Sequence, residues 1–490
     1  QRVEYFKGNE DQAIDSVLRA LKRLGISTDG NTENQALGQA PTSKPQTKAK
    51  SPTLAIAAIA IIALLALVFI FKPSSDPPAA KPSAPTEEPT TATQPEAKPL
   101  DKNRIVVLPF RNIGTAGEND HIVEGIVVDL NTMLSNVDGL KVIGSVSAKT
   151  YKDTEKSPTE IGRELKAGTL IQGSIQKAGA QLKINVQLID TTSGEIIWAK
   201  NFDGSETELF SLQSQIVQSV GGNLEGIRID ESILNALKKS GTTNPKAYDL
   251  AQRAKALMGD SSKISTKKAI NLLEQAVRLD PNYADAFAFL GVAHSDSTSL
   301  SIELPKNAFP KAKQAFEKCL ELDPSNPNAL AGLGELAFLF DWDMKKAKRL
   351  LDQAAKRNPH APNLIATYCL FYKATGDTKN MADTALRGIE NDPKFAYLHQ
   401  IYSNSLYLDG DMNNAEKHNL IALSLSSSFQ WALHQRSVIL LDSKKFNEAE
   451  ELLIQGIKDD PGNPVSVMSL GVVYWKWGKK EQALSLLSDL

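Results

Sequence analysis

The 490-residue chain is poor in the residues that build catalytic and metal sites, with two cysteines and six histidines. We find no phosphate-binding glycine loop, no two-histidine zinc helix and no serine nucleophile motif. We therefore predict no catalytic residue, no cofactor and no metal site, and no enzyme activity for this chain. Cys319 and Cys369 fall at small-residue positions of predicted helices, so we expect them to pack in the core rather than to form a disulfide.

The chain also lacks a bias of charge. Its formal net charge is −2 over 490 residues. A charge this close to zero gives no electrostatic attraction for nucleic acid, so we predict no nucleic-acid partner.

A regular spacing marks the second half of the chain. A proline, once replaced by serine, recurs at intervals of 43, 35, 34, 34 and 34 residues, namely at Pro281, Pro324, Pro359, Pro393, Ser427 and Pro461. A period near 34 indicates helix-turn-helix repeats that stack into a solenoid. Stacked repeats leave an extended concave surface whose use is binding.

Other residues recur in phase with the prolines. Small residues stand where two helices must touch, and larger apolar residues follow one turn later: Ala269, Ala312, Ala347, Ala415, Ala449 and Ala483, then Leu273, Phe316, Leu351, Leu453 and Leu487. Gly376, Gly410 and Gly478 fall at the expected turns. This pattern resembles the tetratricopeptide repeat over residues 244–490, with about seven units, the last incomplete.

Two departures from the repeat carry predictions of their own. The 43-residue step holds about nine extra residues, which we expect to form a longer turn near Ser295–Ala308. In the fourth unit Met381 and Ala385 replace the usual alanine and large residue.

An apolar run lies near the start of the chain. Leu54 to Phe71 are 18 residues without a charge, a length that just spans the ~30 Å hydrocarbon layer of a bilayer. A buried soluble helix would show a polar face, and a signal peptide would not follow about fifty other residues. We therefore predict a transmembrane helix at 53–72, with the lipid bilayer as a partner of Leu54–Phe71.

Lysines and linkers suggest a topology for this segment. Lysines are slightly more frequent before the run than after it, which favours a cytoplasmic N-terminus. We predict a single-pass protein of the bacterial inner membrane with a periplasmic C-terminal region. We assign 1–26 to the tail of a missing cytosolic domain, 27–52 to a disordered linker and 73–102 to a proline-rich linker.

The region 103–227 is predicted to be an independent α/β domain. Residues 104–110 read as a strand, because the unbroken apolar run 105–110 is typical of a strand buried on both faces. Residues 120–136 show helical periodicity, and in the predicted strand 182–189 residues 182–188 alternate strictly between apolar and polar. The pattern predicts a mixed sheet with helices packed on it.

Short motifs in this region, taken in order, resemble a known module. They include Ile105-Val-Val-Leu-Pro-Phe110, Glu124-Gly125-Ile126, Leu170-Ile-Gln-Gly-Ser174 and Trp198. The string is similar to the TolB-like N-terminal domain attached to bacterial adenylate cyclases and membrane-bound winged-helix activators. The resemblance implies an extracytoplasmic module for sensing or association, without known catalytic residues.

The predicted fold class is therefore α/β plus all-α: a single transmembrane helix, a TolB-like mixed-sheet domain and a tetratricopeptide-repeat solenoid. The predicted function is that of a membrane-anchored protein-binding and signal-transducing protein. The alternative is the regulatory part of a larger signalling enzyme, an adenylate cyclase or Toll-like NAD hydrolase, or of a membrane-bound transcription regulator. Homo-oligomerisation is left open.

The resemblance also implies where a protein or peptide partner binds. In this repeat family the first helices line the concave groove, and four positions of each unit point into it. In units five to seven this assigns Tyr397, Gln400, Asn404, Tyr407, Trp431, His434, Val438, Met468 and Trp475. Aromatic residues are common anchors of interfaces, so we expect recognition of an apolar or aromatic segment.

Overall fold

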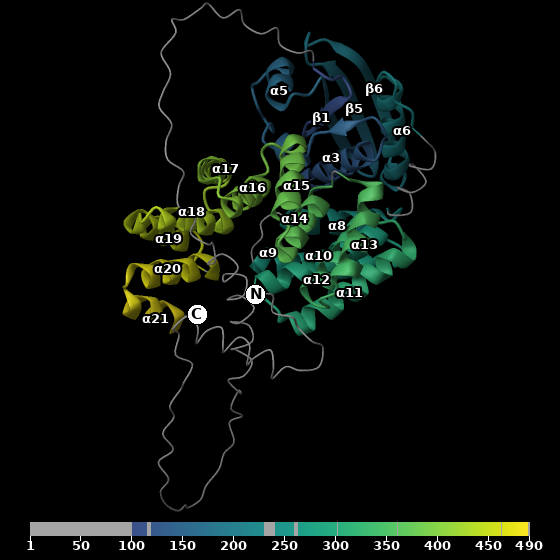
Figure 1. Cartoon of the computed structure of the whole chain (residues 1–490). Coiled ribbons are helices and arrows are strands. Elements are labelled where there is room, and N and C mark those ends of the chain that lie inside the picture. The colour runs from purple at the N-terminus through teal and green to yellow at the C-terminus, as the bar shows by residue number, and fades with distance from the viewer. Residues whose placement is uncertain are drawn as a thin grey trace, which may run out of the picture. The chain divides into compact units, whose positions relative to one another are not determined.

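The computed structural model describes residues 100–114, 119–229, 241–258, 263–300, 302–359, 361–461 and 463–488. All of them belong to one compact unit, Ser75–Leu490. An α/β domain comes first and a series of helices follows it (Figure 1). The predicted segments 1–26, 27–52 and 53–72, and nearly all of 73–102, lie outside the described residues, so their boundaries stay predictions.

The predicted fold class needs a correction. No helix in the described part of the chain is long and apolar enough to cross a membrane. The longest of them, α11 (Pro305–Leu322), has 18 residues of which six are charged, whereas a spanning helix needs about 20 predominantly apolar residues. A fold class with a single transmembrane helix is therefore not supported. The architecture that is supported is an α/β domain followed by a helical solenoid.

The α/β domain is built on a mixed sheet. The sheet has six strands in the order β3-β1-β4-β5-β6, with β2 paired to β4. The strands are β1 (Arg104–Val107), β2 (Arg111–Asn112), β3 (Lys141–Val142), β4 (Thr169–Ala178), β5 (Gln181–Asp190) and β6 (Ile196–Ser205). β1 runs parallel to β3 and β4, whereas β4, β5 and β6 are antiparallel neighbours. Gly179, with a φ of 59°, turns the chain between β4 and β5.

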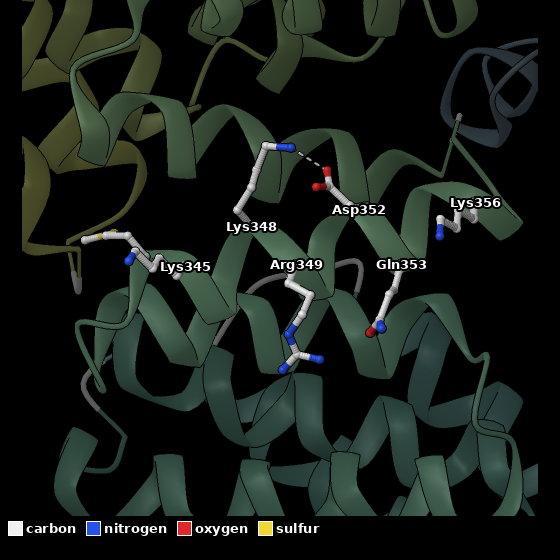
Figure 2. Close-up of a pocket in the computed structure, with 7 residues that line it drawn as sticks. Lys345, Lys348, Arg349, Asp352, Gln353 and Lys356 are labelled. Carbon is white, nitrogen blue, oxygen red and sulfur yellow. Dashed lines mark hydrogen bonds and ion pairs between the residues drawn. The ribbon is translucent and has the colours of Figure 1, made fainter.

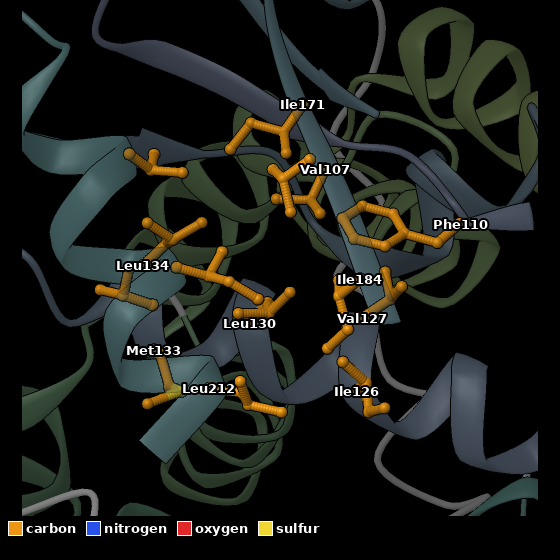
Figure 3. Packing of buried hydrophobic residues seen from close by; sticks show 14 of the residues in the cluster. Val107, Phe110, Ile126, Val127, Leu130, Met133, Leu134, Ile171, Ile184 and Leu212 are labelled. Carbon is orange, nitrogen blue, oxygen red and sulfur yellow. The ribbon is translucent and has the colours of Figure 1, made fainter. Parts of the chain in front are cut away.

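Helices cover both faces of the sheet. Helices α3 (Asp120–Ser135) and α6 (Leu209–Gly222) pack on one face, where Ile126, Leu130 and Leu212 meet Val107 and Ile184 (Figure 3). The short helices α4 (Ser145–Lys149) and α5 (Pro158–Leu165) contribute to a second core on the opposite face.

The two cores explain the two apolar patterns of the sequence. In β1, Ile105 and Val107 face the α3–α6 core while Val106 belongs to the other core, so an unbroken apolar run is required. In β5, Leu182 and Ile184 both face the α3–α6 core, and polar residues alternate with them. The period of two in a strand places alternate side chains on one face.

In the described part of the chain, fourteen helices after the domain form seven consecutive pairs, numbered here 1 to 7 (Figure 1). The first helices are α8 (Pro245–Met258), α10 (Ala284–Ser299), α12 (Pro327–Leu339), α14 (Pro362–Thr375), α16 (Ala396–Asp409), α18 (Gln430–Asp442) and α20 (Pro464–Trp477). The second helices are α9 (Lys263–Leu279), α11 (Pro305–Leu322), α13 (Met344–Arg357), α15 (Thr378–Asn391), α17 (Met412–Leu425), α19 (Phe446–Asp459) and α21 (Lys480–Ser488).

The recurring small residues lie between the helices of the pairs. The six alanines that the repeat pattern singled out are at most 1% exposed, at Ala269, Ala312, Ala347, Ala415, Ala449 and Ala483. Met381 and Ala385, which depart from the pattern, are equally buried in α15. A small side chain lets two helix backbones approach, and the larger residue one turn later fills the space beside them.

The turns within the pairs use two residues with complementary roles. Gly376 and Gly410 end α14 and α16 in the left-handed conformation, with φ of 73° and 90°, which a side chain would oppose. Asp377 and Asp411 follow directly and cap the next helices, accepting hydrogen bonds from the backbone nitrogens of Asn380 and Asn414.

The prediction for the 43-residue step, a longer turn near Ser295–Ala308, is only partly right. The five residues between Ser299 and Pro305 do make a longer connection than the two residues between α14 and α15, but most of the extra residues lengthen the two helices of pair 2. α10 has 16 residues and α11 has 18, whereas α14 to α17 have 14 each. Longer helices add backbone hydrogen bonds and packed surface that a longer turn would not supply.

Candidate functional site

Side chains on the first helices connect neighbouring pairs near the C-terminal end of the solenoid. Asn404 of α16 donates a hydrogen bond to Gln435 of α18, at 2.8 Å. Tyr407 of α16 donates to Asp442 of α18, at 2.6 Å. These two contacts hold α16 against α18 in one register.

The nine predicted groove residues differ in how much surface they offer. Trp431 and Trp475 are 45% and 44% exposed. Gln400, Asn404 and Tyr407 are at most 7% exposed. Tyr397, His434, Val438 and Met468 are half-buried. The buried members stabilise the stacking of the helices, so the surface that a partner can reach is supplied by the other six. Their assignment to a partner stays a prediction.

Trp431 and His434 are brought together on α18. The ring of His434 lies edge-on to the ring of Trp431, with centroids 6.1 Å apart. Nδ1 of His434 is hydrogen-bonded to the hydroxyl of Ser469 on α20, at 2.8 Å. This contact fixes the imidazole beside the indole. Trp475 lies elsewhere on α20, with the amine of Lys480 5.4 Å from its ring.

Tyr397 belongs to a different aromatic group. Its ring lies 6.0 Å from that of Phe395 and 6.1 Å from that of Phe429, and both phenylalanines directly precede first helices. Burial raises the pKa of the Tyr397 phenol well above its usual value, so the hydroxyl remains a neutral donor. The structure therefore places Tyr397 at the N-terminal ends of α16 and α18.

Sequence reasoning missed the charged residues of the first helices. Glu335 is the only charged residue of α12, and Lys373 is the only one of α14. Asp296 is one of two in α10. A lone charge in an otherwise uncharged helix is the sequence signal that could have found them, because charge is rarely retained in an apolar helix without a role.

Burial raises the pKa values of the two acidic residues in this set, Glu335 and Asp296. Desolvation, with a smaller contribution from Asp296, raises the pKa of Glu335 to about 7. Desolvation also raises the pKa of Asp296 to about 6, although Asp296 keeps exposed surface, where water screens part of the effect. A cationic ligand group near these carboxyls would restore their ionisation.

The pKa values of the basic residues Lys373 and His434 are lowered. Burial lowers the pKa of the Lys373 amine to about 8. Burial, and then the charge of Lys373, lowers the pKa of His434 to about 4. The first helices therefore carry acidic groups in pairs 2 and 3, and a cationic amine beside a neutral imidazole farther along. An elongated ligand would meet different charges at its two ends.

The solenoid is joined to the α/β domain through a partly buried polar cluster. The carboxylate of Asp129 on α3 accepts hydrogen bonds from Tyr248 at 2.7 Å and from Gln252 at 3.3 Å, both on α8. Gln213 of α6 donates to the same oxygen, and the amine of Lys255 lies 3.7 Å from the other. These contacts fix pair 1 to the domain. Since the partners are more than 80 residues apart in sequence, local patterns could not predict them.

The described residues contain no group of three or more His, Cys, Asp or Glu side chains arranged to hold a metal ion. Cys319 and Cys369 are free and buried, at core positions as predicted. The first helices of the solenoid offer hydrogen-bonding and aromatic surface, which suits recognition of another chain.

Two family models match parts of this chain. Residues 101–219 match the model described as "HilA/YgeH-like transcriptional regulator, second domain". Residues 307–326 match the tetratricopeptide repeat. The TolB-like resemblance of the first region is not shown by these comparisons. The tetratricopeptide resemblance is supported, both by this match and by the paired helices.

Curated relatives match about half of this chain. A protein of Rhizobium meliloti (strain 1021) named "Putative adenylate cyclase 3" is 28% identical over 269 residues, which cover 55% of this chain and 44% of that protein. The "Transcriptional regulator HilA" of Salmonella paratyphi A (strain ATCC 9150 / SARB42) is 24% identical over 247 residues, covering 50% and 43%. The chain thus spans less than half the length of these relatives.

Solved structures resemble this chain only loosely. The Cut9–Hcn1 hetero-tetramer of APC/C matches 58% of this chain and 53% of that chain, with 12% identity and a TM-score of 0.41. So low a score carries no functional argument. The helix pairs and the repeat match define a scaffold of the tetratricopeptide type, an architecture whose extended surfaces serve protein interaction.

Proposed function

We propose that this chain is a non-catalytic protein-binding and signal-transducing region whose first helices recognise a segment of a protein or peptide. The observation that carries the proposal is the surface of α18 and α20. There an exposed Trp431 lies against His434, and Ser469 holds the imidazole in place. A fixed aromatic anchor beside a polar group is typical of interface hot spots.

The charges of the first helices suggest how the ligand is oriented. Glu335, which is half-buried on α12, would favour a basic or hydrogen-bond-donating part of the ligand, and the exposed Asp296 of α10 supplies a second carboxyl. Lys373, whose charge acts on His434 beside Trp431, would favour a carboxylate or carbonyl oxygen of the ligand there. We therefore propose an extended ligand that carries an aromatic or apolar residue.

A second candidate is the regulatory part of a larger signalling protein, either a cyclase or a transcription regulator. It is favoured by the relatives of both kinds, each more than twice as long as the matched region. The complete coding sequence around this chain would distinguish the two, because a nucleotide-cyclase domain and a DNA-binding domain have different sequence signatures.

The binding proposal can be tested with a random peptide library displayed on phage and selected on the complete chain. Affinities of selected peptides are then measured by fluorescence anisotropy for the chain and for Trp431→Ala. Loss of a hot-spot tryptophan typically costs at least about 2 kcal/mol, so binding should weaken about thirtyfold.

Trp342→Ala is the matched control. Trp342 is 54% exposed but lies in the turn between α12 and α13, so its replacement should leave the affinity unchanged. Tyr407 is unsuitable for this test because it is buried and bonded to Asp442. Equal effects of the two tryptophan variants would place the binding surface outside the first helices.

A further inference from the structure

The second helix of pair 3 carries an unusual concentration of positive charge. Of the 14 residues of α13, six are lysine or arginine and one is acidic. The whole chain has a formal net charge of −2. This charge is therefore a local feature of α13 and is not a consequence of composition.

Half of these cations have anionic partners within the protein. Lys346 pairs with Asp341 at 3.6 Å, and Lys348 pairs with Asp352 one turn along the helix. Arg357 binds the buried carboxylate of Asp323, with a nitrogen–oxygen distance of 2.9 Å. These pairs tie α13 to its surroundings.

The other three cations form a stripe. Lys345, Arg349 and Lys356 are exposed, and none has an ion pair or hydrogen bond to another described residue. Spacings of four and seven residues place all three on one side of a helix, along about 17 Å. We call them the basic stripe.

The stripe borders a shallow concavity. Its volume is about 540 Å³, and it is lined along α13 from Met344 to Lys356. In Figure 2 the paired Lys348 and Asp352 lie on one edge of the helix, while Arg349 and Gln353 extend together from the other. Arg349 is therefore accessible, next to an amide that can both donate and accept hydrogen bonds.

Neighbouring second helices extend the positive region. α9 has four basic residues against one acidic, and α11 has four against two. By contrast, α19 has four acidic residues against one basic. Pairs 1 to 3 therefore present a positive second-helix surface, with the strongest excess on α13.

We propose that the basic stripe of α13 is a docking surface for an acidic segment of a partner protein, separate from the first-helix surface. Three cations along one helix side match carboxylates at helical spacing, and a guanidinium can bind a carboxylate through two hydrogen bonds. A duplex presents a phosphate every ~1.7 Å and is held by more contacts than three. A bilayer surface is usually bound by an amphipathic helix with a broad apolar face or by a larger basic cluster.

The test uses a fluorescein-labelled alanine-based helical peptide with glutamates at positions i, i+4, i+7 and i+11, which fits the stripe in either direction. Its affinity for the complete chain is measured by anisotropy at low ionic strength. The same peptide with glutamine in place of glutamate is the first control. We expect binding of the glutamate peptide alone, and it should weaken as salt is added.

Lys345→Gln, Arg349→Gln and Lys356→Gln, made together, remove the stripe while keeping good helix formers. This variant should bind about tenfold more weakly, the effect of losing three exposed ion pairs. The matched control is Lys417→Gln, Lys458→Gln and Lys476→Gln, which lowers the net charge equally at exposed sites elsewhere. The control and the groove variant Trp431→Ala should both bind the peptide normally.

Three results would overturn the proposal. The two triple variants could lose affinity equally, which would indicate a non-specific charge effect. The glutamine peptide could bind as well as the glutamate peptide. An oligonucleotide duplex or vesicles of anionic phospholipid could bind the unmodified chain, but not the stripe variant, more tightly than the acidic peptide does.

Discussion

The carboxylate of Asp392, at the end of α15, accepts hydrogen bonds from both the backbone nitrogen and the hydroxyl of Ser147 on α4. The two residues are 245 positions apart in sequence and both are buried. The hydroxyl also accepts from the backbone nitrogen of Lys394, at 2.8 Å. Gly144 is required beside them, since a Cβ there would lie 2.1 Å from a carboxylate oxygen of Asp392.

This contact gives the first prediction. Asp392→Ala leaves the donors of Ser147 buried without an acceptor, which costs about 1–3 kcal/mol of the free energy of unfolding. Asp383→Ala, an exposed change on the same helix, should have little effect. Urea denaturation of both variants measures the difference. Equal stability of the two would show that the contact does not hold the domain against the solenoid.

The second prediction concerns the ring of Phe316, which lies against two helical glycines, Gly291 and Gly332. A Cβ at Gly332 would lie 2.2 Å from the ring, whereas a Cβ at Gly471 would meet nothing closer than 4.0 Å. Alanine favours a helix over glycine by about 1 kcal/mol at either site, but overpacking costs about 1–3 kcal/mol. Gly332→Ala should therefore lower the melting temperature, and Gly471→Ala should maintain or raise it. The reverse order would refute this packing.

The third prediction concerns pH and a histidine pair. Nδ1 of His399 lies 3.0 Å from Nδ1 of His418, and Nε2 of His399 lies 3.0 Å from the carbonyl oxygen of Pro393. The Nε2–H therefore donates to that oxygen, so neutral His399 accepts at Nδ1 from His418. Burial lowers the pKa of both rings, and that of His418 falls to about 4 from an ordinary 6.5, helped by His399 and Lys417.

The direction of the pH dependence of stability follows from the number of protons that the folded and unfolded chains bind. Below pH 6.5 the unfolded chain takes up a proton at position 418 that the folded chain does not, so the free energy of unfolding falls as pH falls from 6.5 to about 4. His418→Gln, whose amide can still donate to His399, should flatten the pH dependence in this window. Urea denaturation across the window measures it. An unchanged slope in the variant would contradict the pairing.

Much of the fold could be predicted from local patterns. Ala347 and Ala449 are fully buried where the 34-residue period placed them, because that spacing reflects contacts between helices adjacent in sequence. The alternation of residues 182–188 likewise predicted which face of β5 is buried. The predicted transmembrane helix was a different inference, from composition alone, and it is not supported by the described helices.

The candidate site depended on tertiary structure. Tyr407 and Trp475 were assigned to the groove by the same positional rule, yet one is 7% and the other 44% exposed. The difference arises because Tyr407 meets Asp442 of the next pair, a contact that no rule about a single repeat contains. The charged residues Glu335 and Lys373 were visible in sequence, but only the stacked helices give them their desolvated surroundings.

The sequence by itself therefore determined the helix pairs, their turns and the alternating strands, because each is encoded by side chains a few residues apart. The tertiary structure decided which groove residues are exposed, how α8 and α15 attach to the α/β domain, and which cations of α13 have no ion-pair partner among the described residues. Those features depend on pairs such as Ser147 and Asp392, whose contact arises only when segments 245 residues apart in sequence are folded together.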